Sequence, residues 1–265
     1  MKNKNLIRRD NRPRNFNTKI LIALHKPYSV PRDESYFPIF CGHAGKSYEF
    51  GGQTDDSGEN ISRKNAYYSE LTALYWAWKN LQCDIIGLVH YRRYFFDEVH
   101  GVKRILRKRD FEEIMTRADI LLPKKLTMEK GMTIWEHYAA VHCEEDLQFV
   151  RQYICSNYPE YVSIFDCVMQ QKSIHVWNMF CMPKARFDAY CAWLFPILFA
   201  LEERIDFATR SDYQKRACGF MSERLFNVWI AKENLHIEER DVWNLEKHHR
   251  VRTWMQMKWN GFFKK

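Results

Sequence analysis

Residues 84–96 read Asp-Ile-Ile-Gly-Leu-Val-His-Tyr-Arg-Arg-Tyr-Phe-Phe, a short apolar run that ends abruptly in cationic and aromatic side chains. The length of the run and its β-branched residues predict a buried strand. Ligands of open α/β sheets bind beyond the carboxyl ends of the strands. The groups that follow this strand, His90, Tyr91, Arg92 and Arg93, are therefore expected to border a binding site. Because guanidinium groups match the oxygens of phosphate and carboxylate, the predicted ligand is an anion.

Strands and helices alternate around this run. Short apolar segments predict strands at 19–25 and 118–123. Apolar residues at helical spacing predict helices at 65–80, with Asn65 as its cap, and at 108–117. Such alternation is typical of βαβ units and a largely parallel sheet. The rest of the chain is expected to be mostly helical, at 134–157, 159–171, 184–204 and 212–233, with one short strand at 177–182. The predicted fold class is α/β, with a mostly parallel, Rossmann-related sheet and a helix-rich C-terminal half.

The composition is that of a globular protein, with 265 residues of which 46% are hydrophobic. We expect a disordered basic arm at 1–17, a single domain at 18–246 and a basic, aromatic tail at 247–265. No window reaches the roughly 18 consecutive apolar residues of a membrane span, and the N-terminus lacks the apolar core of a signal peptide. The expected location is therefore the cytoplasm. The eight cysteines form no C-x-x-C pair and are expected to be reduced thiols.

The positive charge lies at the two ends of the chain. Residues 1–19 and residues 247–265 each carry a net charge of +6, so the total of +8 leaves the body at −4. A nucleic-acid-binding domain needs its basic footprint on the folded surface, and this distribution argues against one. Trp254, Trp259 and Phe262 share one helical stripe of the tail with basic residues around them. That pattern suits a helix on an anionic membrane surface, although packing of the stripe on the body is the alternative.

Several acidic residues are candidates for chemistry, and each also has a structural interpretation. Glu223 and Arg224 lie in a strongly apolar helical stretch, where a carboxylate either acquires a raised pKa and serves as a base or forms a buried ion pair. His142 and Asp146 are spaced to share one helical face, as a catalytic or a surface pair. Glu70 either complements a helix N-terminus or faces a cleft.

Two further groups of residues complete the candidates. Tyr67 and Tyr68 precede Glu70 and offer surface for stacking on a sugar. Asp55 and Asp56, in a Gly-rich turn, are the residues expected to hold a divalent cation if one binds, and a solvated turn is the simpler interpretation. For the arginine doublet the alternative is pairing with surface acids such as Asp97 and Glu98, with His90 as a core histidine whose hydrogen bonds are satisfied within the protein.

Seven blocks of the sequence, taken together, resemble a family of bacterial glycosyltransferases of capsular-polysaccharide, exopolysaccharide and O-antigen synthesis, long labelled a domain of unknown function. The blocks are Asn60-Ile-Ser62, Asn65, Tyr68-Ser-Glu-Leu-Thr-Ala-Leu-Tyr-Trp-Ala-Trp-Lys-Asn80, Gly87-Leu-Val-His-Tyr-Arg-Arg-Tyr-Phe95, Asn178-Met-Phe180, Tyr190-Cys-Ala-Trp-Leu-Phe195 and Gly219-Phe-Met-Ser-Glu-Arg224. They span most of the chain from residue 19 to about residue 230. One departure is Ser69, where relatives are expected to have cysteine.

The resemblance implies a GT-A-like fold and transfer of a sugar from a nucleotide-sugar donor, with a UDP-sugar expected, to a lipid-linked glycan at the inner leaflet of the membrane. Typical GT-A enzymes end a central strand in Asp-x-Asp, which holds a divalent cation on the donor diphosphate. Here His90-Tyr-Arg-Arg93 stands in that place. Fixed cations are therefore expected to replace the metal, and no cofactor is expected.

In the mechanism that the resemblance and these residues imply, His90, Arg92 and Arg93 stabilise the departing nucleoside diphosphate. A carboxylate takes the proton of the acceptor hydroxyl, with Glu223 as the first choice and Asp146 as the second. Tyr91 and Asn178 are expected to contact sugar or acceptor. Two other classes of function stay open at this point. A non-catalytic carbohydrate-binding protein would bind sugar without releasing nucleoside diphosphate, and a nucleic-acid binder would depend on the basic ends and on salt.

Overall fold

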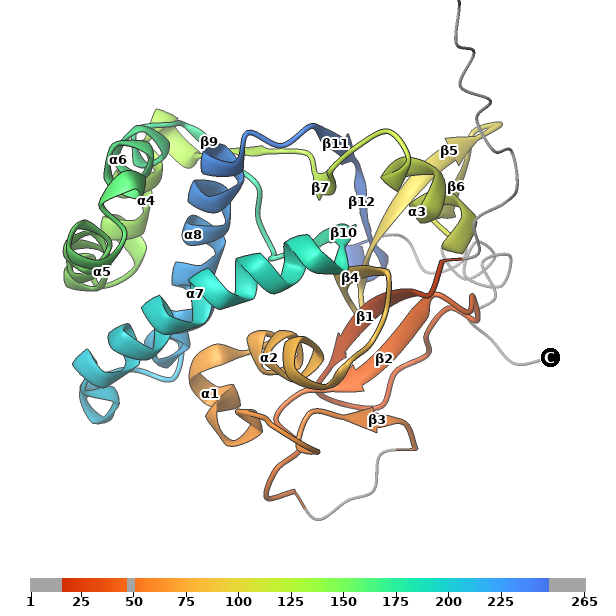
Figure 1. Cartoon of the computed structure of the whole chain (residues 1–265), viewed down its shortest axis with the longest axis horizontal. Helices are drawn as coiled ribbons and strands as arrows, with labels where there is room; N and C mark the ends of the chain where they lie inside the picture. Colours follow the sequence, from red (N-terminus) through yellow and green to blue (C-terminus); the bar gives the residue numbers. More distant parts are fainter. Residues whose placement is uncertain (1–15, 47–50, 248–265) are drawn as a thin grey trace, which may run out of the picture.

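The structure is a computed structural model, and it describes residues 16–46 and 51–247 (Figure 1). Most of the predicted arm at 1–17 and of the predicted tail at 247–265 lies outside the described residues. The first described residues already belong to the fold, because the backbone N–H of Asn17 donates to Asp84 Oδ2 at 2.8 Å.

One mixed sheet forms the centre of the molecule. Strand β4 (Ile85–His90) pairs in parallel with β1 (Thr18–Leu24) and antiparallel with β10 (Phe180–Pro183). The strand order is β11-β7-β10-β4-β1-β2-β3, and β10 runs against its neighbours. The remaining strands of this order are β2 (Tyr36–Phe40), β3 (Gln53–Thr54), β7 (Ile120–Pro123) and β11 (Ile237–Arg240).

Both faces of the sheet are buried, which explains why its strands read as continuous apolar runs. On β1, Leu21 and Ala23 join one core with α2, α7 and α8, while Ile20 and Ile22 join a second core with α3 and β5. Helices α4, α5 and α6 gather at the end of the molecule away from the β5–β6 hairpin (Figure 1). The helices are α1 (Asn65–Tyr68), α2 (Leu71–Asn80), α3 (Lys108–Met115), α4 (Ile134–Val141), α5 (Glu144–Asn157), α6 (Val162–Met169), α7 (Lys184–Arg204) and α8 (Ala217–Glu233).

Two predicted helices are interrupted. The helix expected at 65–80 breaks at Ser69, whose φ is 51°, into α1 and α2. Asn65 is not a cap but spans the break, since its Nδ2 donates to the carbonyl of Ser69 at 2.7 Å. The helix expected at 134–157 breaks at His142, which has extended backbone. His142 and Asp146 therefore lie on different elements, and the prediction that they share a helical face is wrong.

The residues after β4 do not form a loop but a tight hairpin. His90 pairs with Arg93 across the turn, and β5 (Arg93–Val99) returns beside β4 before pairing with β6 (Val102–Ile105). Directly opposed residues of an antiparallel pair project to the same face. His90 and Arg93 are therefore neighbours, while Tyr91 and Arg92 form the tip.

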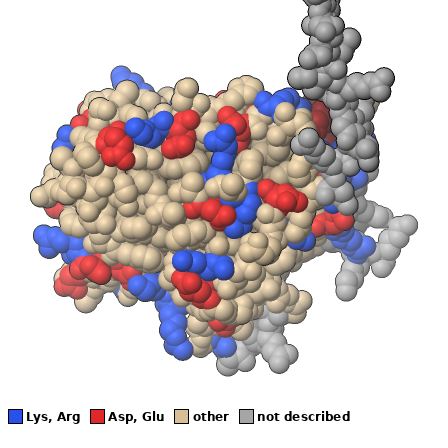
Figure 2. Space-filling view, in the orientation of Figure 1, with Lys and Arg blue, Asp and Glu red and all other residues tan. Residues whose placement is uncertain are grey.

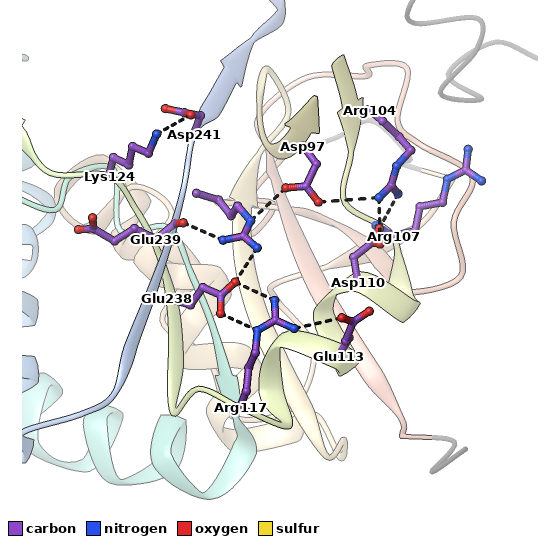
Figure 3. Close-up of polar contacts among 11 residues, drawn as sticks. Asp97, Arg104, Arg107, Asp110, Glu113, Arg117, Lys124, Glu238, Glu239 and Asp241 are labelled. Carbon is purple, nitrogen blue, oxygen red and sulfur yellow. Dashed lines mark hydrogen bonds and ion pairs between the residues drawn. The ribbon is translucent and has the colours of Figure 1, made fainter. Parts of the chain in front are cut away.

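Strands β11 and β12 (Val242–Asn244) were not expected, because three of the four residues of β11 are charged and β12 has only three residues. Ionic contacts hold β11 in place (Figure 3), and β12 pairs with β5 through its backbone. Arg117 of α3 binds Glu238 through two hydrogen bonds of 2.8 Å, and Arg240 Nε donates to Asp97 of β5 at 3.0 Å. These contacts connect the end of the chain to α3 and β5. Two small strands lie apart from this sheet, β8 (Leu126–Thr127) and β9 (Ser173–Ile174).

On the face drawn in Figure 2, basic and acidic side chains lie next to one another in small groups, and uncharged surface lies between these groups. That face therefore carries no large patch of one charge sign. No helix among the described residues has the length and apolar character needed to cross a membrane.

Gly87, in the middle of β4, allows β10 to approach closely. A Cβ at this position would lie 2.7 Å from the carbonyl oxygen of Phe180 and 2.8 Å from Ile20 Cδ1. We expect Gly87→Ala to lower the free energy of unfolding by about 1–3 kcal/mol, as overpacking of a core does. Urea denaturation measures this, with Gly51→Ala as the control because nothing lies within 4 Å of its added Cβ. Equal midpoints for the two variants would contradict the close approach.

Candidate active site

A cavity of about 810 Å³ lies at the carboxyl ends of the parallel strands β1, β2 and β4. Residues at or just beyond these ends, such as His25, Cys41 and His90, form its floor. The opposite wall comes from the segment before α8 and from α8 itself, with Arg216 and Glu223. The predicted site is therefore a cavity at the predicted edge of the sheet, and the quoted run 84–96 supplies its centre.

The two adjacent arginines, Arg92 and Arg93, make different contacts. Arg92, at the tip of the hairpin, donates from Nη1 to Glu246 Oε2 at 2.7 Å and does not pair with Asp97. Arg93 lies against the ring of Trp177, with its guanidinium carbon 5.1 Å from the ring centroid. Among the described residues, no carboxylate forms an ion pair with Arg93. Burial and the neighbouring Arg92 lower the pKa of the Arg93 guanidinium, so an anion bound here would supply a missing partner.

His90 supports the turn that precedes β10. Its Nε2 lies 2.7 Å from the carbonyl oxygen of Trp177, which can only accept, so this nitrogen carries the proton. Burial lowers the pKa of His90, which favours the neutral ring. The imidazole therefore contacts the protein backbone where a phosphate contact was expected. Trp177 and Asn178 both have positive φ, 71° and 51°, a conformation that costs about 1–3 kcal/mol for a non-glycine residue.

Glu70 lies both at the N-terminus of α2 and at the cavity, so its two interpretations do not exclude each other. No side-chain cap contact forms at the start of α2, and Glu70 Oε1 accepts a hydrogen bond of 2.8 Å from Asn178 Nδ2. Asn178 is 3% exposed, and its Oδ1 lies 3.1 Å from the hydroxyl of Ser222. Asn178 thus orients Glu70 and does not line the cavity itself.

Glu223 also lines the cavity. Its Oε1 accepts from the backbone N–H of Trp177 at 2.8 Å, and its Oε2 lies 3.1 Å from Arg224 Nη1. Burial raises the pKa of Glu223, with a smaller opposing effect from Arg224. The predicted ion pair therefore forms, and the carboxylate also borders the cavity.

Three predicted site residues lie elsewhere. Tyr67 stacks on Phe207 with ring centroids 3.8 Å apart, and Tyr68 is fully buried with its hydroxyl donating to Glu202 at 2.9 Å. Neither is available for stacking on a sugar in this cavity. Asp146 is 4% exposed and binds Arg210 through two hydrogen bonds of 2.7 Å. The structure does not bring Asp146 to the cavity. Tyr91 does line it and packs edge-on against Tyr28.

Asp55 and Asp56 hold the loop after β2. Asp55 is fully buried and accepts from the backbone N–H groups of Gly42 at 2.7 Å and His43 at 3.1 Å, and Asp56 pairs with His43 Nδ1 at 2.8 Å. Among residues 16–46 and 51–247, no group of three or more His, Cys, Asp or Glu side chains could hold a metal ion. At the end of β4, the side chains are an imidazole and two guanidiniums. Such a donor set does not fit a divalent cation.

On the opposite wall of the cavity, sequence reasoning identified Glu223 but missed Arg216 and its neighbours. Arg216 donates from Nε to Ser69 Oγ at 3.0 Å and lies over the ring of Phe220, which contacts Tyr213 and His142. Basic and aromatic residues do alternate in this stretch, but nothing local shows that it returns to the sheet edge. Both Ser69 and Arg216 line the cavity.

Comparisons with known proteins agree with this fold. A sequence profile described as "Domain of unknown function (DUF4422)" matches residues 19–234. Among solved structures, that of the bifunctional glycosyltransferase WbbM in its apo form matches with a TM-score of 0.79 and 31% sequence identity. The match covers 85% of this chain and 45% of that chain, so this chain spans less than half of the bifunctional protein. No curated protein matches the chain.

The structural match confirms the predicted fold class, an α/β structure of the GT-A-like type with a mostly parallel central sheet. The profile covers the strands, the hairpin and the helices that build the cavity, including Glu70, Arg93 and Glu223. The chain therefore belongs to the DUF4422 family.

Proposed function

We propose that this protein is a glycosyltransferase that moves a sugar from a nucleotide-sugar donor, a UDP-sugar, to a growing surface polysaccharide on a lipid carrier. One observation carries the proposal. The cavity at the carboxyl edge of the sheet brings together two carboxylates, Glu70 and Glu223, and the guanidinium of Arg93, which has no carboxylate partner in the described part of the chain. A cation that meets a leaving diphosphate and a carboxylate that accepts a hydroxyl proton are the two requirements of glycosyl transfer to an alcohol.

In this proposal the donor diphosphate binds at the hairpin tip. Arg93 makes the main contact because its fork has no carboxylate partner among the described residues, and Arg92 contributes from the edge, where Glu246 already holds one of its nitrogens. His90 contributes by fixing Trp177, over which Arg93 lies. The cations stabilise the charge that develops on the nucleoside diphosphate as the bond to the sugar breaks.

The match to a bifunctional glycosyltransferase at 31% identity supports the reaction class. That protein is more than twice as long as the matched region, so its activities come to this chain as a proposal and not as a finding. Capsular polysaccharide, exopolysaccharide and O-antigen are the classes of product that the family resemblance suggests.

The test is a thermal-shift screen of nucleotide sugars and free UDP, followed by measurement of UDP release. A ligand present at about 100 times its dissociation constant adds about 2.7 kcal/mol of stability, which raises the melting temperature. We expect UDP and at least one UDP-sugar to stabilise the protein, with and without chelator. If no nucleotide sugar stabilises it and none is consumed, the proposed function is wrong.

We also propose that the enzyme works in the cytoplasm, at the inner face of the membrane, through its basic tail. Residues 248–265 are outside the described part of the chain, so this proposal depends on their sequence. Deleting residues 248–265 is expected to abolish binding to anionic vesicles in a sedimentation assay, while UDP binding persists. Unchanged sedimentation of the truncated protein would contradict a membrane role for the tail.

A further inference from the structure

Three carboxylates border the cavity, and they differ in how their oxygens are used. The side chain of Asp212 is 97% exposed and pairs with Lys215 at 2.8 Å, outside the enclosed part of the site. Glu70 and Glu223 remain as groups that could exchange a proton with a bound substrate. The two carboxylates differ in how many of their oxygen atoms lack a hydrogen-bond or ion-pair partner among the described residues, and this difference indicates which of them is the better candidate for a base.

Glu223 has a contact on each oxygen. Oε1 holds the backbone N–H of Trp177 at 2.8 Å, and Oε2 lies 3.1 Å from Arg224, whose side chain is 6% exposed. Protonating Glu223 would weaken its attraction for a buried guanidinium and for the N–H of a turn with positive φ. With both oxygens in use, Glu223 suits a group that holds the turn.

Glu70 has one oxygen held and one free. Asn178 Nδ2 donates to Oε1 at 2.8 Å, and no described residue contacts Oε2 through a hydrogen bond or ion pair. The amide can present only its N–H group to a carboxylate, so the orientation of Asn178 is fixed. Glu70 also sits at the start of α2, directly after the break at Ser69, so its backbone is held as well. A carboxylate with one anchored and one open oxygen has the geometry of a general base.

We propose that Glu70 is the general base of the transfer reaction and that Glu223 and Asn178 are positioning residues. Glu70 Oε2 takes the proton of the acceptor hydroxyl. The acceptor oxygen forms a bond to the anomeric carbon as the bond from that carbon to the phosphate oxygen breaks. The electron pair of the broken bond leaves with the nucleoside diphosphate, whose charge Arg93 meets. Attack of this kind inverts the anomeric carbon. The inference rests on the proposed function and replaces Glu223 as its first choice of base.

The position of Glu70 is set from several elements. Asn178 comes from the turn before β10, and Ser222 of α8 lies 3.1 Å behind it. The charged and titratable groups that influence or share this corner are His90 and Arg93 of the hairpin, Glu223 of α8 and Cys41 after β2. Because Glu223 holds Trp177, the residue next to Asn178, it fixes Glu70 through the turn without touching the acceptor.

A matched pair of variants of the full chain, Glu70→Gln and Glu223→Gln, separates the two roles. Both changes remove a charge and keep a side-chain oxygen, so Asn178 and the Trp177 N–H each retain an acceptor. For each protein, UDP affinity is measured by calorimetry. Turnover is measured as UDP release across a pH range, using the UDP-sugar that the wild type consumes.

We expect Glu70→Gln to lower kcat by about 10²–10⁴-fold, the usual contribution of general base catalysis, and to remove the acid limb of the pH profile. UDP affinity should stay within about threefold, since the donor site is intact. Glu70→Asp keeps a base one methylene shorter and should recover part of the activity together with the acid limb. We expect Glu223→Gln to keep the acid limb and to lose about tenfold or less.

The reverse pattern would overturn the inference. If Glu223→Gln removes the acid limb while Glu70→Gln keeps it, Glu223 is the base. If Glu70→Gln is active with an unchanged profile, Glu70 has no part in proton transfer. Loss of UDP binding by Glu70→Gln, with Glu70→Asp also inactive, would assign Glu70 to donor binding. Failure of the proposed function looks different, because the wild type would then neither bind UDP nor release it from any donor.

Discussion

Arg93→Lys is expected to lower turnover by about 10²–10³-fold, the loss seen when one preorganised group that stabilises transition-state charge is removed. The substitution keeps the positive charge but loses the planar fork that binds two phosphate oxygens at once. Arg93 has no carboxylate partner among the described residues and lies over Trp177 in the cavity, so little in the protein competes with a diphosphate for it.

Arg92→Lys is the matched control, since it changes the neighbouring side chain in the same way. Arg92 already binds Glu246 at 2.7 Å and is more exposed, so its replacement should cause a smaller loss. Steady-state UDP release and UDP calorimetry on both variants measure the difference. Near-normal turnover by Arg93→Lys, or a larger loss with Arg92→Lys, would show that the fork of Arg93 is not the diphosphate contact.

Asp146→Ala is expected to lower the free energy of unfolding by about 3–5 kcal/mol, because it leaves a guanidinium without its partner in a mostly buried position. Asp146 and Arg210 form a bidentate pair whose side chains are 5% and 15% exposed. Activity per folded molecule should be close to that of the wild type at low temperature, since the pair lies outside the cavity.

The chain offers a second bidentate pair for comparison. Arg151 also binds Asp166 through two hydrogen bonds, from Nε and Nη2, but their side chains are 42% and 43% exposed. Asp166→Ala should therefore cost about 1 kcal/mol or less. Urea denaturation of both variants tests the role of burial. A folded Asp146→Ala protein that has lost catalysis without losing stability would restore Asp146 as a catalytic residue.

The sequence predicted the place of the site because local rules sufficed there. An apolar run of strand length must be buried, and the residues that follow it must lie at the edge of the sheet, so His90 and Arg93 could be located without any distant contact. The same rules placed β1, α3 and α7 close to their observed bounds. Family resemblance, and not periodicity, added the reaction class.

Several errors share a cause, which is that partners distant in sequence decide what a polar side chain does. Arg92 pairs with Glu246 and Asp146 pairs with Arg210, and neither pair is visible in a window of helical or strand length. The break at Ser69 was missed for a different reason. A serine with positive φ has no sequence signal of its own. Strand β11 depends on ionic contacts to α3 and β5, which hydrophobic patterns do not register.

The reversed direction of β10 has a consequence for how the protein matures. Its amino end, not its carboxyl end, reaches the ligand edge, so Trp177 and Asn178 arrive at the cavity only when β10 has inserted between β4 and β7. Pairing of Leu88 with Phe180 closes a long stretch of chain, and such non-local pairings form slowly. During synthesis the hairpin arginines emerge well before the turn and helix that complete their surroundings. Catalytic activity should therefore appear late in synthesis, after α8 has emerged from the ribosome.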